Sequence, residues 1–213
     1  RITKIGLLES EFEMFKTNNI LNGDCKLTPP FAYNPSIKIE NFNKKFKDNN
    51  IIVGNCSAIE IGHLDIFNLI SNLDFNKVLV PLSYGNFDYR EKVINFGKVL
   101  FSERFIPIVN FKSLIEYRQF FKTASYYIDN SRRQRGFGNI ILCLEFGVKI
   151  FLNQTNPVYS HVKNLGGYIW TIDEISNYNL KPLTQNESLK NSPIVDKFYL
   201  RDKIIMNWQF FLK

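Results

Sequence analysis

The sequence is poor in the residues that build disulfide frameworks and zinc sites. Its 213 residues include three cysteines and two histidines. Cys25, Cys56 and Cys143 are odd in number and far apart, which fits neither a disulfide framework nor a Cys/His metal cluster. No Asp-x-Asp pair occurs, so the metal–diphosphate clamp built on that motif is missing. We therefore expect a reducing compartment, no bound metal and no cofactor.

Long apolar segments are also missing. No run approaches the roughly 20 residues that a transmembrane helix needs, and the start does not resemble a secretory signal. The chain opens on Arg1 instead of Met, and we expect it to be part of a longer protein. What it has in excess is positive charge, with a formal net charge of +7. This balance favours nucleic acid, a phosphorylated small molecule or an acidic membrane as partner, although a solvated basic face would give the same total.

From residue 49 onward, short apolar segments alternate with segments of helical periodicity. This alternation predicts βαβ units and a parallel sheet flanked by helices, which is an α/β, Rossmann-like fold. We place this domain at residues 49–180, after a polar, Asn/Lys-rich linker and before a tail (181–213) whose basic, aromatic helix spans Val195 to Lys213. Six segments are each predicted to start with a strand: 49–58, 77–85, 99–106, 125–131, 148–157 and 166–175.

Four polar or glycine-containing turns follow these strands, at the edge where parallel sheets bind ligands. In the first, Gly54 allows close backbone approach, Asn55 and Ser57 offer polar groups, and a helix carrying His63 follows. In the second, the ring of Tyr84 is suited to stacking on a base or sugar. A capped turn in the first case and core packing in the second would explain the same residues.

The third turn concentrates positive charge in front of a helix. Arg132, Arg133 and Arg135 precede Gly136 and Gly138. Unpaired N–H groups at a helix start and arginine side chains both bind phosphate. The motif is not the dinucleotide G-x-G-x-x-G, because residue 141 is Ile, and no Gly-Lys-Ser/Thr follows as in a P-loop. A solvated arginine run remains the alternative.

The fourth turn contains Asn153 and Asn156, whose amides can bond to hydroxyl groups. Asn-Pro is also a common turn. Glu145, about two turns into the helix after the Gly-x-Gly, could accept a ribose hydroxyl if it faces the site.

Five segments in this order resemble a known family: IIVGNCSAIEIGH, VLVPLSYGNFDYREKV, LFSERF, SRRQRGFGNIILCLEFGVKIFLNQTNPV and IWTIDEI. From about Ile51 to Ile175 the chain is similar to the bacterial TDP-N-acetylfucosamine:lipid II N-acetylfucosaminyltransferases, glycosyltransferase family 56. It lacks the Gly-Asp-Arg that follows Asn55 in that family. It has Asn139 where Thr is usual and Glu145 where Gln is usual.

The resemblance implies the nucleotide-sugar-binding domain of a metal-independent GT-B glycosyltransferase. Residues 1–48 would be the end of an acceptor-side domain and the linker. The implied reaction moves a 4-acetamido-4,6-dideoxygalactose-type sugar from a TDP-sugar to a polyprenyl-diphosphate-linked glycan, in enterobacterial common antigen synthesis. No catalytic residue is assigned. The expected donor contacts are Gly54, Asn55, Ser57, His63, Tyr84, Arg132, Arg133, Gln134, Arg135, Gly136, Gly138, Asn139, Glu145, Asn153, Asn156 and Pro157, with the arginines facing the diphosphate.

The lipid acceptor implies peripheral attachment to the cytoplasmic face of the inner membrane, with Trp208, Phe210 and Phe211 as candidate anionic-membrane contacts. Core packing is the alternative for these aromatic residues. Two other functions remain open: a capsule or O-antigen transferase using another nucleotide-sugar, and a non-catalytic nucleotide-sugar-binding module. A nucleic-acid partner is disfavoured, because the arginines cluster at one strand end and do not follow a groove.

Overall fold

The structure is a computed structural model that describes residues 4–21, 23–28, 48–176 and 180–199, together with residues 205, 206 and 209. The expected linker upstream of residue 48 and the aromatic residues Trp208, Phe210 and Phe211 lie outside the described residues.

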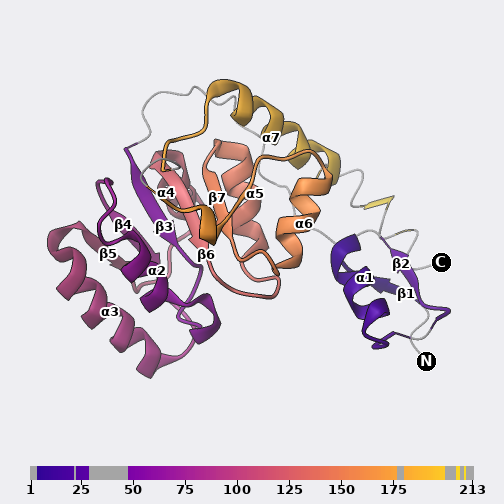
Figure 1. Ribbon diagram of the computed structural model, residues 1–213, viewed down its shortest axis with the longest axis horizontal. Coiled ribbons are helices and arrows are strands. Elements are labelled where there is room, and N and C mark those ends of the chain that lie inside the picture. Colours follow the sequence, from indigo (N-terminus) through magenta and orange to yellow (C-terminus); the bar gives the residue numbers. More distant parts are fainter. Residues whose placement is uncertain are drawn as a thin grey trace.

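Within this part of the chain, one parallel sheet dominates the fold (Figure 1). The order of its strands is β5-β4-β3-β6-β7-β8, which is the doubly wound Rossmann order and confirms the predicted fold class. The strands are β3 (Asn50–Val53), β4 (Val78–Pro81), β5 (Phe105–Ile108), β6 (Ala124–Asp129), β7 (Lys149–Leu152) and β8 (Trp170–Thr171).

Helices cover both faces of this sheet. One face carries α2 (His63–Ile70) and α3 (Phe87–Phe101). The chain then passes to the other face, which carries α4 (Leu114–Thr123), α5 (Phe137–Phe146) and α6 (Pro157–Asn164), with α7 (Gln185–Tyr199) packed on α5. Three short 3₁₀ turns complete the domain: η1 (Ile59–Ile61), η2 (Ser102–Arg104) and η3 (Ile172–Glu174).

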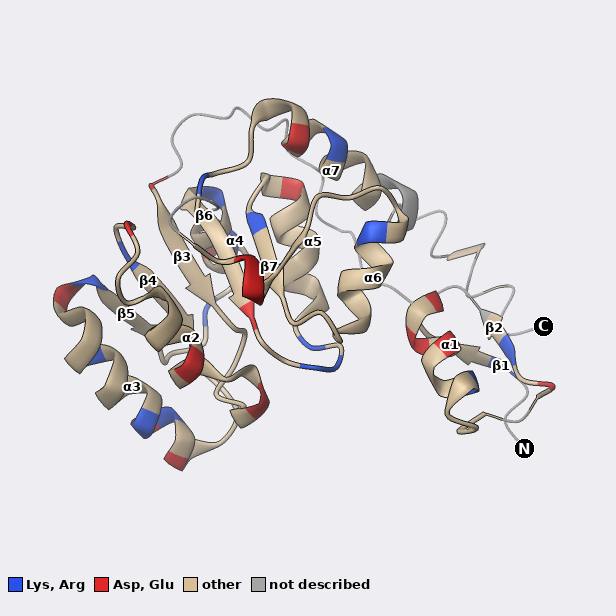
Figure 2. Ribbon diagram, in the orientation of Figure 1, with Lys and Arg blue, Asp and Glu red and all other residues tan. Residues whose placement is uncertain are grey.

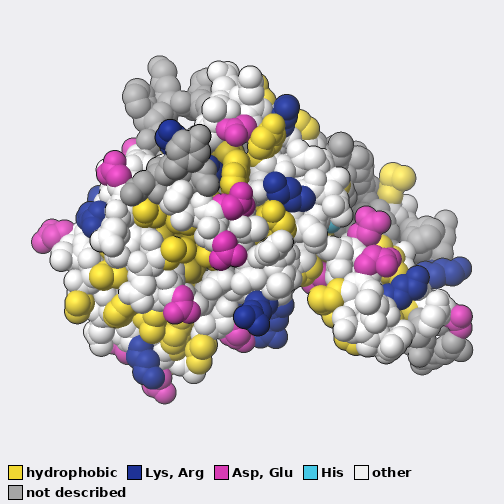
Figure 3. Space-filling model, viewed as in Figure 1, with side chains coloured by type: hydrophobic (Ala, Val, Ile, Leu, Met, Phe, Trp, Pro, Cys, Tyr) yellow, Lys and Arg dark blue, Asp and Glu magenta, His cyan; other side chains and the backbone are white. Residues whose placement is uncertain are grey.

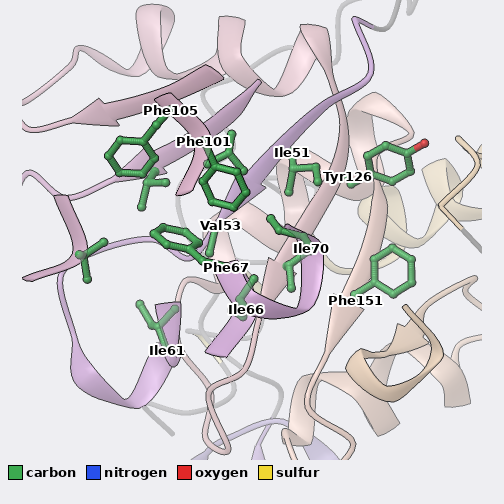
Figure 4. Packing of buried hydrophobic residues seen from close by; sticks show 14 of the residues in the cluster. Ile51, Val53, Ile61, Ile66, Phe67, Ile70, Phe101, Phe105, Tyr126 and Phe151 are labelled. Carbon is green, nitrogen blue, oxygen red and sulfur yellow. The ribbon is translucent and has the colours of Figure 1, made fainter. Parts of the chain in front are cut away.

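Alternating residues of the strands supply two separate cores. In β3, Ile52 joins the α4–α6 side, whereas Ile51 and Val53 join the α2–α3 side. Figure 4 shows the second core, in which Phe67 of α2 meets the rings of Phe101 and Phe105 edge to face. The four central strands, β3, β4, β6 and β7, are buried along their whole length, which agrees with the mostly apolar sequences from which a parallel sheet was predicted.

Two predicted boundaries were wrong. The segment 99–106 does not begin a strand: Val99 to Phe101 end helix α3, and β5 starts at Phe105. Among the described residues, helix α7 begins at Gln185, ten residues before the helix start predicted at Val195. Thr184 and Glu187 form its capping box, in which the Thr184 N–H donates to the Glu187 carboxylate over 2.8 Å.

A small β-α-β unit precedes the main domain, formed by β1 (Lys4–Gly6), α1 (Glu9–Thr17) and β2 (Lys26–Thr28), with the two strands parallel. Its helix contacts α6, where the Ser10 hydroxyl donates to the carbonyl of Pro157 over 2.7 Å. This unit therefore lies against the helix that follows β7 (Figure 1).

Candidate functional site

The site lies where the strand order reverses, between β3 and β6. From these neighbouring strands the chain leaves toward opposite faces of the sheet, and this opens a crevice at their carboxyl ends. Backbone hydrogen bonds join the segments that leave β3 and β6. The Gly54 N–H donates to the Ile128 carbonyl, and the Asn130 N–H donates to the Ile61 carbonyl. The β3–α2 loop and the β6–α5 loop, which are far apart in sequence, thus form one mouth.

The buried carboxylate of Asp129 fixes the start of the β6–α5 loop. One oxygen accepts the Ser131 N–H over 2.8 Å, and the other accepts the Tyr127 hydroxyl over 3.2 Å. Burial raises the pKa of Asp129, while these two partners and the nearby Arg135 lower it. The loop therefore leaves the sheet in a set direction.

Asn156 holds the same loop from the other side. Its amide nitrogen donates to the carbonyls of Ser131 (2.9 Å) and Arg133 (3.1 Å), and its amide oxygen caps α6 by accepting the Val158 N–H over 3.0 Å. Asn153 donates to the side chain of Asn130 over 2.7 Å. Asn156 was expected as a donor contact, and the structure places its side chain in the interior, with its amide bonded to other parts of the protein.

The arginines of this loop lie at the mouth, where one carboxylate binds two of them. Glu60 Oε1, from the turn η1 after β3, accepts from Arg133 over 2.7 Å and from Arg135 over 3.1 Å. The backbone N–H of Glu60 itself and the two guanidinium groups lower the pKa of this carboxyl. Arg132 and Gln134 are exposed beside them. Figures 2 and 3 show the positive charge gathered on the loop that leads to α5.

Two glycines flank Phe137 at the start of α5. Gly136 is the N-cap, with φ of 58°, and an added Cβ would lie 3.0 Å from Asn55 across the crevice. A larger residue would be strained and would push the two loops apart. An added Cβ on Gly138 would meet nothing within 4 Å, so the first turn is open to an incoming group.

Asn55 and Tyr84 complete the mouth. The Asn55 amide nitrogen donates to the exposed Tyr84 hydroxyl over 3.0 Å, while its amide oxygen is buried and has no partner among the described residues. Ser57 has a different role from the expected one. Its hydroxyl is buried and donates to the Tyr84 carbonyl over 2.8 Å, so it joins the β3 and β4 loops.

His63 lies behind the mouth and not in it. Its side chain is completely buried, with Nε2 about 3.0 Å from where a Cβ on Gly54 would stand. Its neighbours include the rings of Phe67 and Tyr89. Burial lowers the pKa of His63 to about 3, so the ring is neutral. His63 was expected as a donor contact, and the structure places it in the interior next to the mouth.

Two expected donor contacts on α5 also turn inward. Asn139 is buried and donates to the Tyr117 hydroxyl over 3.0 Å. Glu145 lies eight residues after the helix start, about 12 Å along the axis, and forms a buried ion pair with Arg118. A carboxylate held there cannot reach a ligand at the mouth.

No direct signal in the sequence pointed to Glu60 or Asp129. Glu60 is 73 residues before Arg133, and only the pairing of β3 with β6 brings them together. Asp129 could have been noticed as a carboxylate that ends an apolar strand, two residues before a serine.

The described residues contain no group of three or more His, Cys, Asp or Glu side chains arranged to hold a metal ion. None of the described helices is long and apolar enough to cross a bilayer.

The fold and the mouth at the switch point define a class: the chain matches the α/β domains of GT-B glycosyltransferases. The Anabaena protein HepE, solved with UDP and glucose, matches with a TM-score of 0.73 at 10% identity, over 99% of this chain and 63% of that one. AviGT4, a glycosyltransferase involved in avilamycin A biosynthesis, matches with a TM-score of 0.64 at 7% identity, over 97% and 66%. The pneumococcal O-GlcNAc transferase GtfA, solved with UDP and GlcNAc, matches with a TM-score of 0.60 at 13% identity, over 98% and 44%.

The family follows from the sequence model that matches residues 10–191. This chain belongs to glycosyl transferase group 56, the 4-alpha-L-fucosyltransferase family. The comparison with curated proteins gave no match. The chain spans less than two thirds of the length of HepE and less than half that of GtfA.

Proposed function

We propose that this chain binds a nucleotide-sugar at the switch point and forms the donor half of a glycosyltransferase. The observation that carries this proposal is the placement of Arg133 and Arg135 beside the open first turn of α5. The family membership and the UDP complexes of HepE and GtfA support it.

The proposed chemistry is glycosyl transfer to an acceptor hydroxyl. As the bond between the sugar carbon and the phosphate oxygen breaks, negative charge grows on the leaving diphosphate. The two guanidinium groups and the N–H groups at the start of α5 stabilise that charge. Gly136 allows the backbone to come close to the phosphates, and the exposed ring of Tyr84 stacks on the base or sugar.

A binding experiment tests this proposal. Thermal-shift and calorimetric titrations would compare TDP, UDP and GDP and their sugars on the wild type. Replacing Arg133 and Arg135 with Gln should weaken the binding of the preferred nucleotide about tenfold or more, because charge-assisted bonds to phosphate are lost.

The control removes two positive charges elsewhere. Lys92 and Lys98 are exposed on α3, and the double variant K92Q/K98Q should bind like the wild type. The proposal is wrong if no nucleotide binds, or if the arginine variant and the lysine variant bind equally well.

The finer proposal follows the resemblance: a TDP-linked 4-acetamido-4,6-dideoxygalactose-type donor, a polyprenyl-diphosphate-linked acceptor, catalysis without a metal, and peripheral location at the cytoplasmic face of the bacterial inner membrane. The UDP complexes of HepE and GtfA favour a uridine donor as the second candidate. Preference for TDP over UDP in the same titrations supports the first candidate, and the reverse supports the second. Transfer in the presence of EDTA would test metal independence, and cosedimentation with anionic vesicles would test membrane attachment.

A further inference from the structure

We propose that Glu60 acts as a stand-in anion, binding Arg133 and Arg135 until a diphosphate replaces it, and thereby sets the affinity of the site. This inference rests on the proposed function. It assigns a role to Glu60, which lies outside the β6–α5 loop that carries the arginines and Gly136.

The geometry shows one carboxylate oxygen serving two cations. Glu60 Oε1 accepts from Nη2 of Arg133 and from Nη2 of Arg135, across the crevice between the two strands. A phosphate oxygen would make the same charge-assisted bonds to the same two groups. In this arrangement the carboxylate therefore takes the place of one oxygen of the ligand.

The exposure of the three side chains makes the contact exchangeable. The Glu60 side chain is 48% exposed, that of Arg133 65% and that of Arg135 26%. Exposed ion pairs contribute little net stability, because water solvates the separated charges well. A diphosphate brings at least two negative charges and several acceptor oxygens, so it can displace a single carboxylate.

The loop backbone does not have to move during the exchange. Asn156 holds the carbonyls of Ser131 and Arg133, and Asp129 holds the Ser131 N–H. Only the guanidinium ends and the Glu60 side chain need to rearrange.

Glu60 therefore weakens the binding of the ligand and favours its release. A ligand must compete with Glu60 to enter, and Glu60 can take the arginines back when the nucleoside diphosphate leaves. Removing its charge while keeping its size should therefore tighten binding and slow dissociation.

The test compares E60Q with the wild type, using UDP and TDP as probes in calorimetry and stopped-flow experiments. We expect E60Q to bind about fivefold more tightly, with the gain shrinking at high salt. The control is E91Q, which removes one negative charge from the exposed Glu91 on α3 and should leave the affinity near that of the wild type. In the background R133Q/R135Q, the effect of E60Q should disappear, because its partners are gone.

Each outcome decides the inference. Weaker binding by E60Q would show that Glu60 positions the arginines, and affinity equal to that of E91Q would show that it does nothing; both overturn the proposal. If the wild type binds UDP or TDP through its arginines but E60Q does not gain affinity, only the role of Glu60 fails. If the wild type binds neither nucleotide, the proposed function fails, and this inference fails with it.

Discussion

Helix α5 has an arginine–glutamate contact at each end, and the two contacts differ in burial. At the start of the helix, Glu60 meets Arg133 and Arg135 in an exposed mouth. At its end, Glu145 meets Arg118 of α4, with side-chain exposures of 6% and 8%. The same chemical groups thus form an exchangeable contact in one place and a fixed one in the other.

At the buried Arg118–Glu145 pair, both Nη atoms of the arginine are already bonded to the glutamate. Arg118 donates through both Nη atoms to the two oxygens of Glu145, and its guanidinium group lies over the ring of Phe146 at 4.9 Å. Separating these charges would leave both of them buried, which is costly, whereas water solvates the charges at the other end.

The largest expected effect is at the buried end. Replacing Glu145 with Gln should lower the free energy of unfolding by about 3–5 kcal/mol, because Arg118 would stay buried without a counterion. Urea unfolding followed by circular dichroism would measure this loss. E60Q should leave the urea midpoint unchanged in the same experiment.

A double replacement sharpens the comparison. R118L/E145L removes both buried charges and should recover much of the stability that E145Q loses. If E145Q unfolds no more easily than E60Q, then burial does not distinguish the two contacts, and the comparison fails.

The second prediction concerns the clamp behind the exposed arginines. N156A should lower the free energy of unfolding by roughly 2–4 kcal/mol, since it removes the cap of α6 and leaves two loop carbonyls without their donor. It should also weaken nucleotide binding, because the backbone that presents Arg133 is released.

N156D separates these two roles of Asn156. Aspartate still caps α6 but cannot donate to the loop carbonyls, so part of the stability should return while nucleotide binding remains weak. Wild-type affinity in N156D would show that the arginine loop keeps its shape without this clamp.

The smallest expected effect on stability concerns His63, which is buried behind the mouth. Its pKa is lowered to about 3 in the folded protein, below its ordinary value of 6.5, so the unfolded chain binds the extra proton first as the pH falls. Its contribution to stability is complete above about pH 6.5 and declines toward pH 3. At pH 5 the loss should be about 2 kcal/mol.

The measurement is the difference in unfolding free energy between pH 7.5 and pH 5 for the wild type and for H63L. Because other groups titrate in both proteins, only the difference between the two slopes reports on His63. The variant should lose less stability on acidification. Equal slopes would mean that the imidazole is not buried as described.

The pattern of strands and turns could be predicted because it depends on local composition. Continuous apolar segments such as 78–82 must be covered on both faces, and Gly54 and Gly136 follow strands at turns where the chain adopts positive φ. Helix ends were harder to predict. Polar residues around Thr184 looked like a tail, although Thr184 and Glu187 cap a helix.

The roles of single side chains could not be predicted in the same way. Asn139, Glu145 and Asn156 are polar residues in or after predicted ligand-binding turns, and they were expected as donor contacts. Whether such a residue faces the mouth or the interior depends on which helix packs beside it, and α4 and α6 decide this here.

By itself, the sequence determined the doubly wound sheet and the presence of an arginine-rich loop before a helix, because periodicity and chain chirality limit the arrangements that bury such strands. Only the tertiary structure decided which acid meets those arginines. The order of the strands places Glu60 across the crevice from Arg133 and Arg135, because it pairs two strands that lie far apart in the sequence.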